Sequence, residues 1–118
     1  MLTSPKLLLH LEGLLVFAAA IAVYSRLGDS WLTFALLFFV PDVFMLGYLS
    51  GVKTGAAVYN LGHTYATPFL LGLVAWVAQM PLLFFVFVIW IAHIGFDRLL
   101  GYGLKYPTAF KDTHLGRV

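Results

Sequence analysis

The sequence consists of long apolar stretches separated by short polar segments. The apolar stretches cover residues 7–25, 31–49, 56–77 and 82–104. An α-helix of about 20 residues crosses a hydrocarbon core of about 30 Å, and the alternating pattern of a membrane β-barrel is absent. Lipid offers no partners for backbone amides, so helices are the remaining solution. The pattern predicts an all-α, four-transmembrane-helix bundle, followed by a polar tail over residues 105–118.

The composition agrees with a lipid environment. Of the 118 residues, 62% are hydrophobic and 10% are charged, whereas a typical soluble domain carries about 25% charged residues. So few charges do not cover an apolar surface of this extent in water. The chain has no cysteine, which excludes disulfides and thiolate metal ligands. We therefore expect a single-domain, multi-pass membrane protein.

The basic residues lie near the ends of the predicted helices, which favours a membrane topology over nucleic-acid binding. With four spans, the N-terminus, the loop after the second helix and the tail share one side. Arg26 lies on the opposite side, and five basic residues lie on this one: Lys6, Lys53, Lys105, Lys111 and Arg117. This bias predicts cytoplasmic termini in a bacterial inner membrane, with the lipid bilayer as the main partner. A homo-oligomer or a larger membrane complex stays open.

Each predicted helix contains polar side chains that lipid penalises. An ionised residue in mid-helix costs roughly 2.5–3.5 kcal/mol on insertion scales, so these groups must face one another or water. The ionisable ones are Glu12, Asp42, His63, His93, Asp97 and Arg98. At a rise of about 1.5 Å per residue, they fall at similar depths in the cytoplasmic half of the bundle. The sequence therefore predicts one buried site shared by the four helices.

Local spacing indicates the chemistry of this site. His93 and Asp97 are four residues apart and share one helix face. Pro41 removes a backbone hydrogen bond beside Asp42 and predicts a kink there. Carboxylates outnumber the one nearby guanidinium, so we expect either protons or a cation to bind. Two imidazoles and two carboxylates suit a divalent zinc, manganese or iron ion, with Asp42, His63, His93 and Asp97 as its ligands.

Three functions are compatible with such a site, besides a purely structural polar network. The first is a metal-dependent hydrolase acting on a membrane-associated or phosphate-bearing substrate, with Glu12 and Asp42 as catalytic residues. Its predicted substrate-binding residues are Asn60, Arg98, Lys53 and Lys105. The second is an accessory subunit of a membrane complex, in which His63 and His93 ligate haem or another pigment. The third is a small proton-coupled transporter.

Several motifs together resemble a known family. They are Pro41-Asp42 to Gly47-Tyr48, Tyr59-Asn60-Leu61-Gly62-His63, His93 to Arg98 with Gly101 to Tyr106, and Phe110 to Arg117. The pattern resembles a small bacterial integral-membrane family known as domain of unknown function 4260. This resemblance implies a four-helix bacterial membrane protein and supplies no activity. More distantly, Asp42 after a proline and His63 in the next helix are similar to the bacterial membrane-bound metal-dependent hydrolases.

Overall fold

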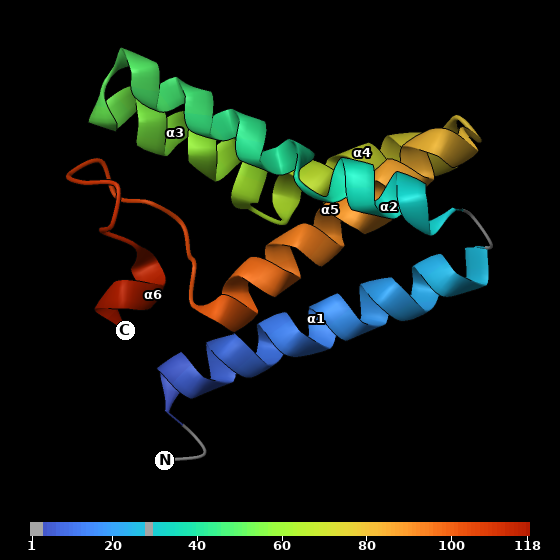
Figure 1. Ribbon diagram of the computed structural model, residues 1–118, viewed down its shortest axis with the longest axis horizontal. Helices are drawn as coiled ribbons and strands as arrows, with labels where there is room; N and C mark the ends of the chain where they lie inside the picture. Colours follow the sequence, from blue (N-terminus) through green and yellow to red (C-terminus); the bar gives the residue numbers. More distant parts are fainter. Residues whose placement is uncertain (1–3, 28–29) are drawn as a thin grey trace.

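The computed structural model describes residues 4–27 and 30–118, and this part of the chain is helical (Figure 1). The elements are α1 (Pro5–Leu27), α2 (Trp31–Phe38), the 3₁₀ helix η1 (Val40–Ser50), α3 (Val52–His63), α4 (Ala66–Val77), α5 (Pro81–Leu100) and α6 (His114–Arg117). The β-type pairing among the described residues is one isolated bridge between Lys105 and Thr113. The all-α prediction is therefore confirmed.

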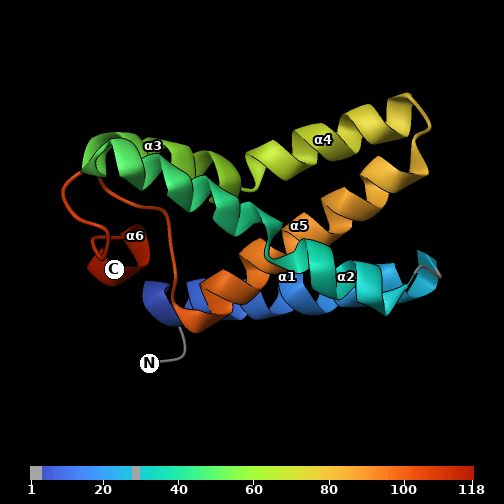
Figure 2. The same ribbon diagram turned by 45° about the horizontal axis from the view of Figure 1, so that its top comes forward.

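The chain runs back and forth between two ends of the molecule (Figures 1 and 2). α1 runs from one end to the other, α2 and η1 return, α3 and α4 lead out again, and α5 returns. The start of α1, the turn between η1 and α3, the end of α5 and the C-terminus consequently lie at the same end. α5 is central, because it packs against α1, α2 and α4 and also contacts η1.

Three helical stretches are long and apolar enough to cross a membrane: Pro5–Leu27, Trp31–Ser50 and Pro81–Leu100. Large apolar side chains such as Leu15 and Leu36, each 68% exposed, cover their outer faces. An apolar surface of this extent is unfavourable in water and favourable in lipid. The chain is thus a helical membrane protein, as its sequence predicts.

The predicted third helix, residues 56–77, is divided in two in the structure. α3 ends at His63, and Thr64 has an extended backbone with φ −97° and ψ 143° before α4 begins at Ala66. Pro68 explains the break, because its ring would clash with the carbonyl of Thr64 in a continuous helix. α4 with its 12 residues is about 18 Å long, shorter than the membrane core.

The second predicted helix changes its geometry near Pro41. α2 ends at Phe38, and Pro41 stands in the first turn of η1. The backbone N–H of Asp42 donates to the carbonyl of Phe39 at 3.0 Å, three residues back instead of four. Such a long run of 3₁₀ helix is uncommon and is typical of strained or functional segments. The kink predicted beside Asp42 is present, as a change of helix type.

The predicted fourth helix, residues 82–104, ends early, at Leu100, because Gly101 adopts a left-handed φ of 95°. The following segment, predicted as a polar tail, folds back against the bundle. The backbone N–H of Leu104 donates to Nδ1 of His114 at 2.8 Å, and Leu115 is buried. Residues 105–118 are therefore part of the folded domain.

Ion pairing within the same segment supports its folded form. Asp112 accepts hydrogen bonds from the guanidinium of Arg117 at 2.8 and 2.6 Å and from the hydroxyl of Thr108. Arg117, and next to it Thr108, hold the pKa of Asp112 at about 2. This carboxylate therefore stays charged at all physiological pH values, and the segment has one pH-sensitive contact left, at His114.

Two glycines bring α1 close to α5, which positions the helix that carries His93 and Asp97. A Cβ atom added at Gly13 would lie 2.6 Å from the backbone nitrogen of Leu99 and 2.7 Å from the carbonyl oxygen of Gly95. No side chain fits in that space, so the two helix backbones are in direct contact. The register of α1 against α5 is therefore fixed by backbone contact.

We predict that acidification releases the C-terminal segment. Burial, and next to it the positive charge of Arg98, lowers the pKa of His114, and a protonated Nδ1 no longer accepts the Leu104 N–H. Because the folded-state pKa is depressed, the contribution of His114 to stability is complete above the ordinary histidine pKa of about 6.5 and is lost as the pH falls through the folded-state pKa. Hydrogen exchange of the Leu104 amide, corrected for its intrinsic rate, should increase between about pH 7.5 and about pH 5. His114→Gln should remove this pH dependence, whereas His10→Gln should keep it.

Candidate metal centre

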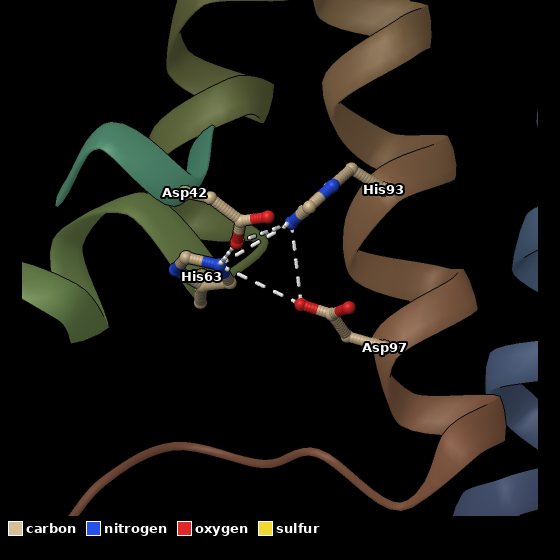
Figure 3. Close-up of side chains that lie close together, drawn as sticks. All are labelled: Asp42, His63, His93 and Asp97. Atoms are coloured by element: carbon tan, nitrogen blue, oxygen red, sulfur yellow. Dashed lines mark hydrogen bonds and ion pairs between the residues drawn. The ribbon is translucent and has the colours of Figure 1, made fainter. Parts of the chain in front are cut away.

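Four potential metal ligands from three elements meet in the structure (Figure 3). Asp42 comes from η1, His63 from the end of α3, and His93 and Asp97 from α5. One donor atom of each residue lies within 4.8 Å of the other three. Both imidazoles are buried, whereas the side chain of Asp97 is 16% exposed and that of Asp42 is 39% exposed. The predicted convergence of acidic and imidazole groups from separate helices is therefore confirmed.

The distances between the donor atoms are those of ligands around a single ion. Nε2 of His63 lies 3.2 Å from Oδ1 of Asp42 and 3.5 Å from Oδ2 of Asp97. Nε2 of His93 lies 3.3 and 3.2 Å from the same two oxygens and 3.3 Å from Nε2 of His63. Metal–ligand bonds of about 2.0–2.1 Å in a tetrahedron place neighbouring donors roughly 3.4 Å apart. All these separations fit that geometry, and the remaining pair, the two carboxylate oxygens, lies within 4.8 Å.

Local features of the chain direct each of the four side chains toward the centre of the cluster. His93 and Asp97 project from adjacent turns of one face of α5 because they are four residues apart. Asp42 follows Pro41 at the start of η1, where the chain changes from α to 3₁₀ geometry. His63 is the last residue of α3, immediately before the break that Pro68 requires. Two proline-induced irregularities therefore lie directly beside two of the four ligands.

Hydrogen bonding fixes the tautomer and the orientation of His63. Its Nδ1 lies 2.9 Å from the carbonyl oxygen of Tyr59, and because a carbonyl only accepts, Nδ1 carries the proton. The lone pair of Nε2 consequently points into the cluster, as in a metal-ligating histidine with a second-shell acceptor. The ring of Tyr59 stacks on the imidazole at 3.8 Å, almost parallel. His63 is thus held in a ligand geometry by the protein itself.

His93 is positioned mainly by packing. Its ring lies edge-on to Phe38, with the ring centroids 5.2 Å apart. Its Nδ1 is buried near the backbone of Phe38 and makes no hydrogen bond of good geometry with the described residues. The His93 side of the cluster is therefore less constrained than the His63 side.

Comparison with known proteins identifies the family. Residues 6–118 match the family described as Domain of unknown function (DUF4260). The chain belongs to this family. No curated protein and no solved structure matches the sequence. The family resemblance expected from the motifs is confirmed, whereas the distant similarity to membrane-bound hydrolases rests on Asp42 and His63 alone.

Two residues predicted to act in this DUF4260 site lie outside the cluster. Glu12, predicted as the catalytic base, is exposed on α1, and it is not part of the ligand group. Gly13, and not Glu12, is the residue of α1 that lies against the backbone of α5. Lys53 is exposed in the first turn of α3, ten residues before His63 and about 15 Å from it along the helix. The geometry supports no direct role at the ligands for either residue.

Two further predicted substrate-binding residues have structural partners. Arg98 is buried, and its guanidinium donates to the carbonyl oxygen of His63 at 3.0 Å, which satisfies a backbone group left free at the end of α3. Asn60 forms two hydrogen bonds with the backbone of Lys105. Its amide donates to the Lys105 carbonyl at 2.9 Å, and its side-chain oxygen accepts from the Lys105 N–H at 2.7 Å. Arg98 and Asn60 therefore stabilise the backbone around the site through hydrogen bonds.

Lys105 is the one predicted substrate-binding residue that reaches the site. It lines a cavity of about 260 Å³ beside the cluster, together with Asp42, Met45, Tyr59, Asp97, Tyr102 and Phe110. The two carboxylate ligands form part of the cavity wall, and the two imidazoles do not. The open side of the cluster is thus its carboxylate edge.

Several of these cavity residues are not among the site residues predicted from the sequence. Tyr59 lies four residues before His63, and this spacing places both on one helix face, so the contact was accessible from the pattern. Phe110 had no comparable signal, because it reaches the cavity only through the folding back of residues 105–118. Tyr102, which follows the end of α5, had no comparable signal either.

We predict that Asn60→Leu destabilises the protein by about 1–3 kcal/mol, because both backbone groups of Lys105 lose their partner in a part-buried place. Thermal unfolding of the detergent-solubilised protein measures the effect. Asn60→Asp keeps the acceptor for the Lys105 N–H but sets a carboxylate oxygen against the Lys105 carbonyl, so it should also be less stable than the wild type. Equal stability of all three proteins would show that Asn60 does not anchor this segment.

Proposed function

We propose that this protein binds a divalent metal ion at Asp42, His63, His93 and Asp97 and uses it to hydrolyse a substrate at the membrane. The observation that carries the proposal is the set of 3.2–3.5 Å separations among donor atoms from three elements. The donor set suits zinc, manganese or ferrous iron. Because the site holds two carboxylates, a divalent ion makes it neutral, which a lipid-embedded bundle favours.

The tautomer of His63 supports an ion over a purely structural network. Its Nε2 presents a lone pair to the carboxylate oxygens of Asp42 and Asp97. Lone pairs at such distances repel one another unless a proton or a metal ion lies between them. Without an ion, protons on Nε2 of His93 and on a carboxyl group have to fill the close contacts. A single divalent ion takes the place of these protons and also neutralises both carboxylates.

The position of the cavity supports hydrolysis. Catalytic metal sites keep a position open for water or substrate, whereas structural sites are closed. Here the carboxylate edge of the cluster borders a cavity large enough for both. A divalent ion lowers the pKa of a water that it binds from its bulk value towards about 7. Asp42, which lines the cavity and is 39% exposed, is better placed than Glu12 to accept a proton from that water.

The same geometry disfavours the other two functions. Axial histidines of a haem lie on opposite faces of the macrocycle with their nitrogens roughly 4 Å apart, since each bond is about 2 Å long. In this site Nε2 of His63 and of His93 are 3.3 Å apart, and two carboxylates share the same space. A proton-coupled transporter would use the carboxylate of α1, Glu12, and this residue lies outside the cluster. An accessory role without a pigment has no specific observation in its favour.

We also propose that the chain crosses the membrane four times, with both termini in the cytoplasm of a bacterium. In this arrangement α3 and α4 together form the third crossing, broken beside the metal centre. Broken helices are tolerated within the membrane where they line a cavity or are buried in protein. α1 and α3 begin, α5 ends and the C-terminus lies at one end of the molecule (Figure 1). Five basic residues belong to these segments, against Arg26 at the end of α1, which supports the cytoplasmic location of this end.

The metal proposal is tested by element analysis of the purified protein after incubation with zinc, manganese or ferrous ions. We expect one ion per chain for the wild type and a loss of affinity greater than about tenfold for His93→Ala and for Asp97→Asn, because each removes a ligand. His10→Ala, which changes a histidine outside the cluster, is the matched control and should bind normally. A wild-type protein that takes up none of these ions would contradict the proposal. Metal-dependent cleavage of a phosphate ester, abolished by a chelator, tests the hydrolytic step.

The topology is tested with single cysteines, because the chain has none of its own. Lys111→Cys should react with a membrane-impermeant maleimide only after the inner membrane is opened. Gln79→Cys, in the exposed turn between α4 and α5, should react in intact spheroplasts. The reverse labelling pattern would place the termini outside.

A further inference from the structure

We propose that the cavity beside the metal centre binds the phosphate group of a phosphodiester, held between the metal ion and the ammonium group of Lys105. This inference rests on the proposed metal site and names the class of substrate that the site would act on. The supporting observations come from Lys105 and from the part of the cavity wall that Met45, Tyr102 and Phe110 form, none of which belongs to the cluster.

Lys105 is a buried residue whose ammonium group faces the cavity and has no protein acceptor among the described residues. Lys105 is 7% exposed, and it lines the cavity. Among the described residues, its Nζ makes no hydrogen bond or ion pair. It contacts two aromatic rings, with Nζ 3.8 Å from the ring centroid of Phe110 and 4.9 Å from that of Tyr59. An ammonium group has three N–H donors, and the two rings accept none of them in a normal hydrogen bond. Their partners must come from the cavity, as water or as the oxygens of a bound anion.

The structure holds the backbone of Lys105 in place. Its N–H and C=O both bind the side chain of Asn60, and it pairs with Thr113 in an isolated bridge. Lys105 is therefore fixed to α3, the helix that ends at His63. This arrangement keeps the ammonium group at a constant place relative to the ligand cluster, as a binding site requires.

The charge balance indicates an anion with a single charge. A divalent ion neutralises Asp42 and Asp97, and Lys105 adds one positive charge. Arg98 keeps its positive charge, because the His63 carbonyl that it binds is neutral, but it does not line the cavity. The groups that face the cavity, with a divalent ion bound, therefore carry a net charge of +1. A phosphodiester carries one negative charge, whereas a phosphate monoester carries about −1.5 to −2 at neutral pH. The diester therefore matches the charge that faces the cavity.

The size and lining of the cavity agree with an ester. Its volume of about 260 Å³ corresponds to roughly nine water molecules at about 30 Å³ each, which exceeds what a bare phosphate needs. Met45, Tyr102 and Phe110 provide apolar surface for the organic substituents. Both a phospholipid headgroup and a small soluble diester have this chemistry, and the experiment below separates them.

The reaction implied by this arrangement balances without a further reactant. The oxygen of water forms a new bond to phosphorus, and the ester P–O bond to one alcohol breaks. One proton of the water leaves with the alcohol, and the other stays with the phosphate monoester that is formed. The ammonium group of Lys105 stabilises negative charge on a non-bridging oxygen during this step.

The test uses the full-length protein in detergent, loaded with Mn²⁺, whose unpaired electrons broaden the phosphorus-31 signal of any phosphate that binds beside it. The probes are diethyl phosphate, inorganic phosphate and dihexanoylphosphatidylglycerol. We expect saturable broadening with the two diesters, weaker binding of inorganic phosphate, and an affinity lower by about tenfold or more in Lys105→Met. Lys111→Met, which changes an exposed lysine of the same segment, is the matched control and should behave as the wild type.

Each result separates the two proposals. Mn²⁺ uptake is measured first on every variant, and a wild type that binds no Mn²⁺ overturns the metal proposal itself. Two outcomes overturn the phosphodiester inference alone. In the first, the wild type binds Mn²⁺ but broadens no phosphorus signal. In the second, Lys105→Met binds the diesters as tightly as the wild type. If Lys105→Met does not take up Mn²⁺, Lys105→Gln takes its place. Tighter binding of dihexanoylphosphatidylglycerol than of diethyl phosphate assigns a lipid headgroup, and equal binding assigns a soluble diester.

Discussion

Two imidazoles and two carboxylates crowd around one point inside an apolar bundle, and the other features of the structure are arranged about that point. At separations of 3.2–3.5 Å, their lone pairs and negative charges repel one another strongly where the dielectric constant is low. A cation placed among them turns this repulsion into coordination. The helices that bring these groups together are held by contacts elsewhere, above all by the close backbone packing of α1 on α5 at Gly13 and Gly95.

The irregular helix segments lie beside the ligands, and the backbone groups that they release find partners. The change to 3₁₀ geometry at Pro41 gives Asp42 its place, and the backbone N–H of Asp42 still bonds to Phe39. The break before Pro68 ends α3 at His63, whose carbonyl accepts from Arg98. In lipid an unpaired backbone group would cost several kcal/mol, so such breaks require polar partners of this kind. Arg98 thus stabilises the break and orients a ligand residue through one hydrogen bond.

The C-terminal segment completes the site from outside the apolar helices. It brings Lys105 and Phe110 to the cavity, and Asn60 and His114 tie it to the bundle through backbone hydrogen bonds. The bond at His114 depends on a neutral imidazole, which links the position of this segment to pH. The carboxylates of Asp42 and Asp97 on the helices and the ammonium group of Lys105 on the folded-back segment together give the cavity one acidic and one basic wall.

The sequence alone determined the helical class and the four residues of the cluster. Long apolar runs have one solution in lipid, and ionisable residues within them must meet, which singled out Asp42, His63, His93 and Asp97. Only the tertiary structure decided that Glu12 lies outside the cluster, that Arg98 and Asn60 bind backbone groups, and that Phe110 reaches the cavity. The reason is physical: lipid surrounds an apolar helix equally on all sides, so its rotation follows from small-residue packing and polar contacts with its neighbours. Those contacts join residues far apart in the chain, and no local spacing reveals them.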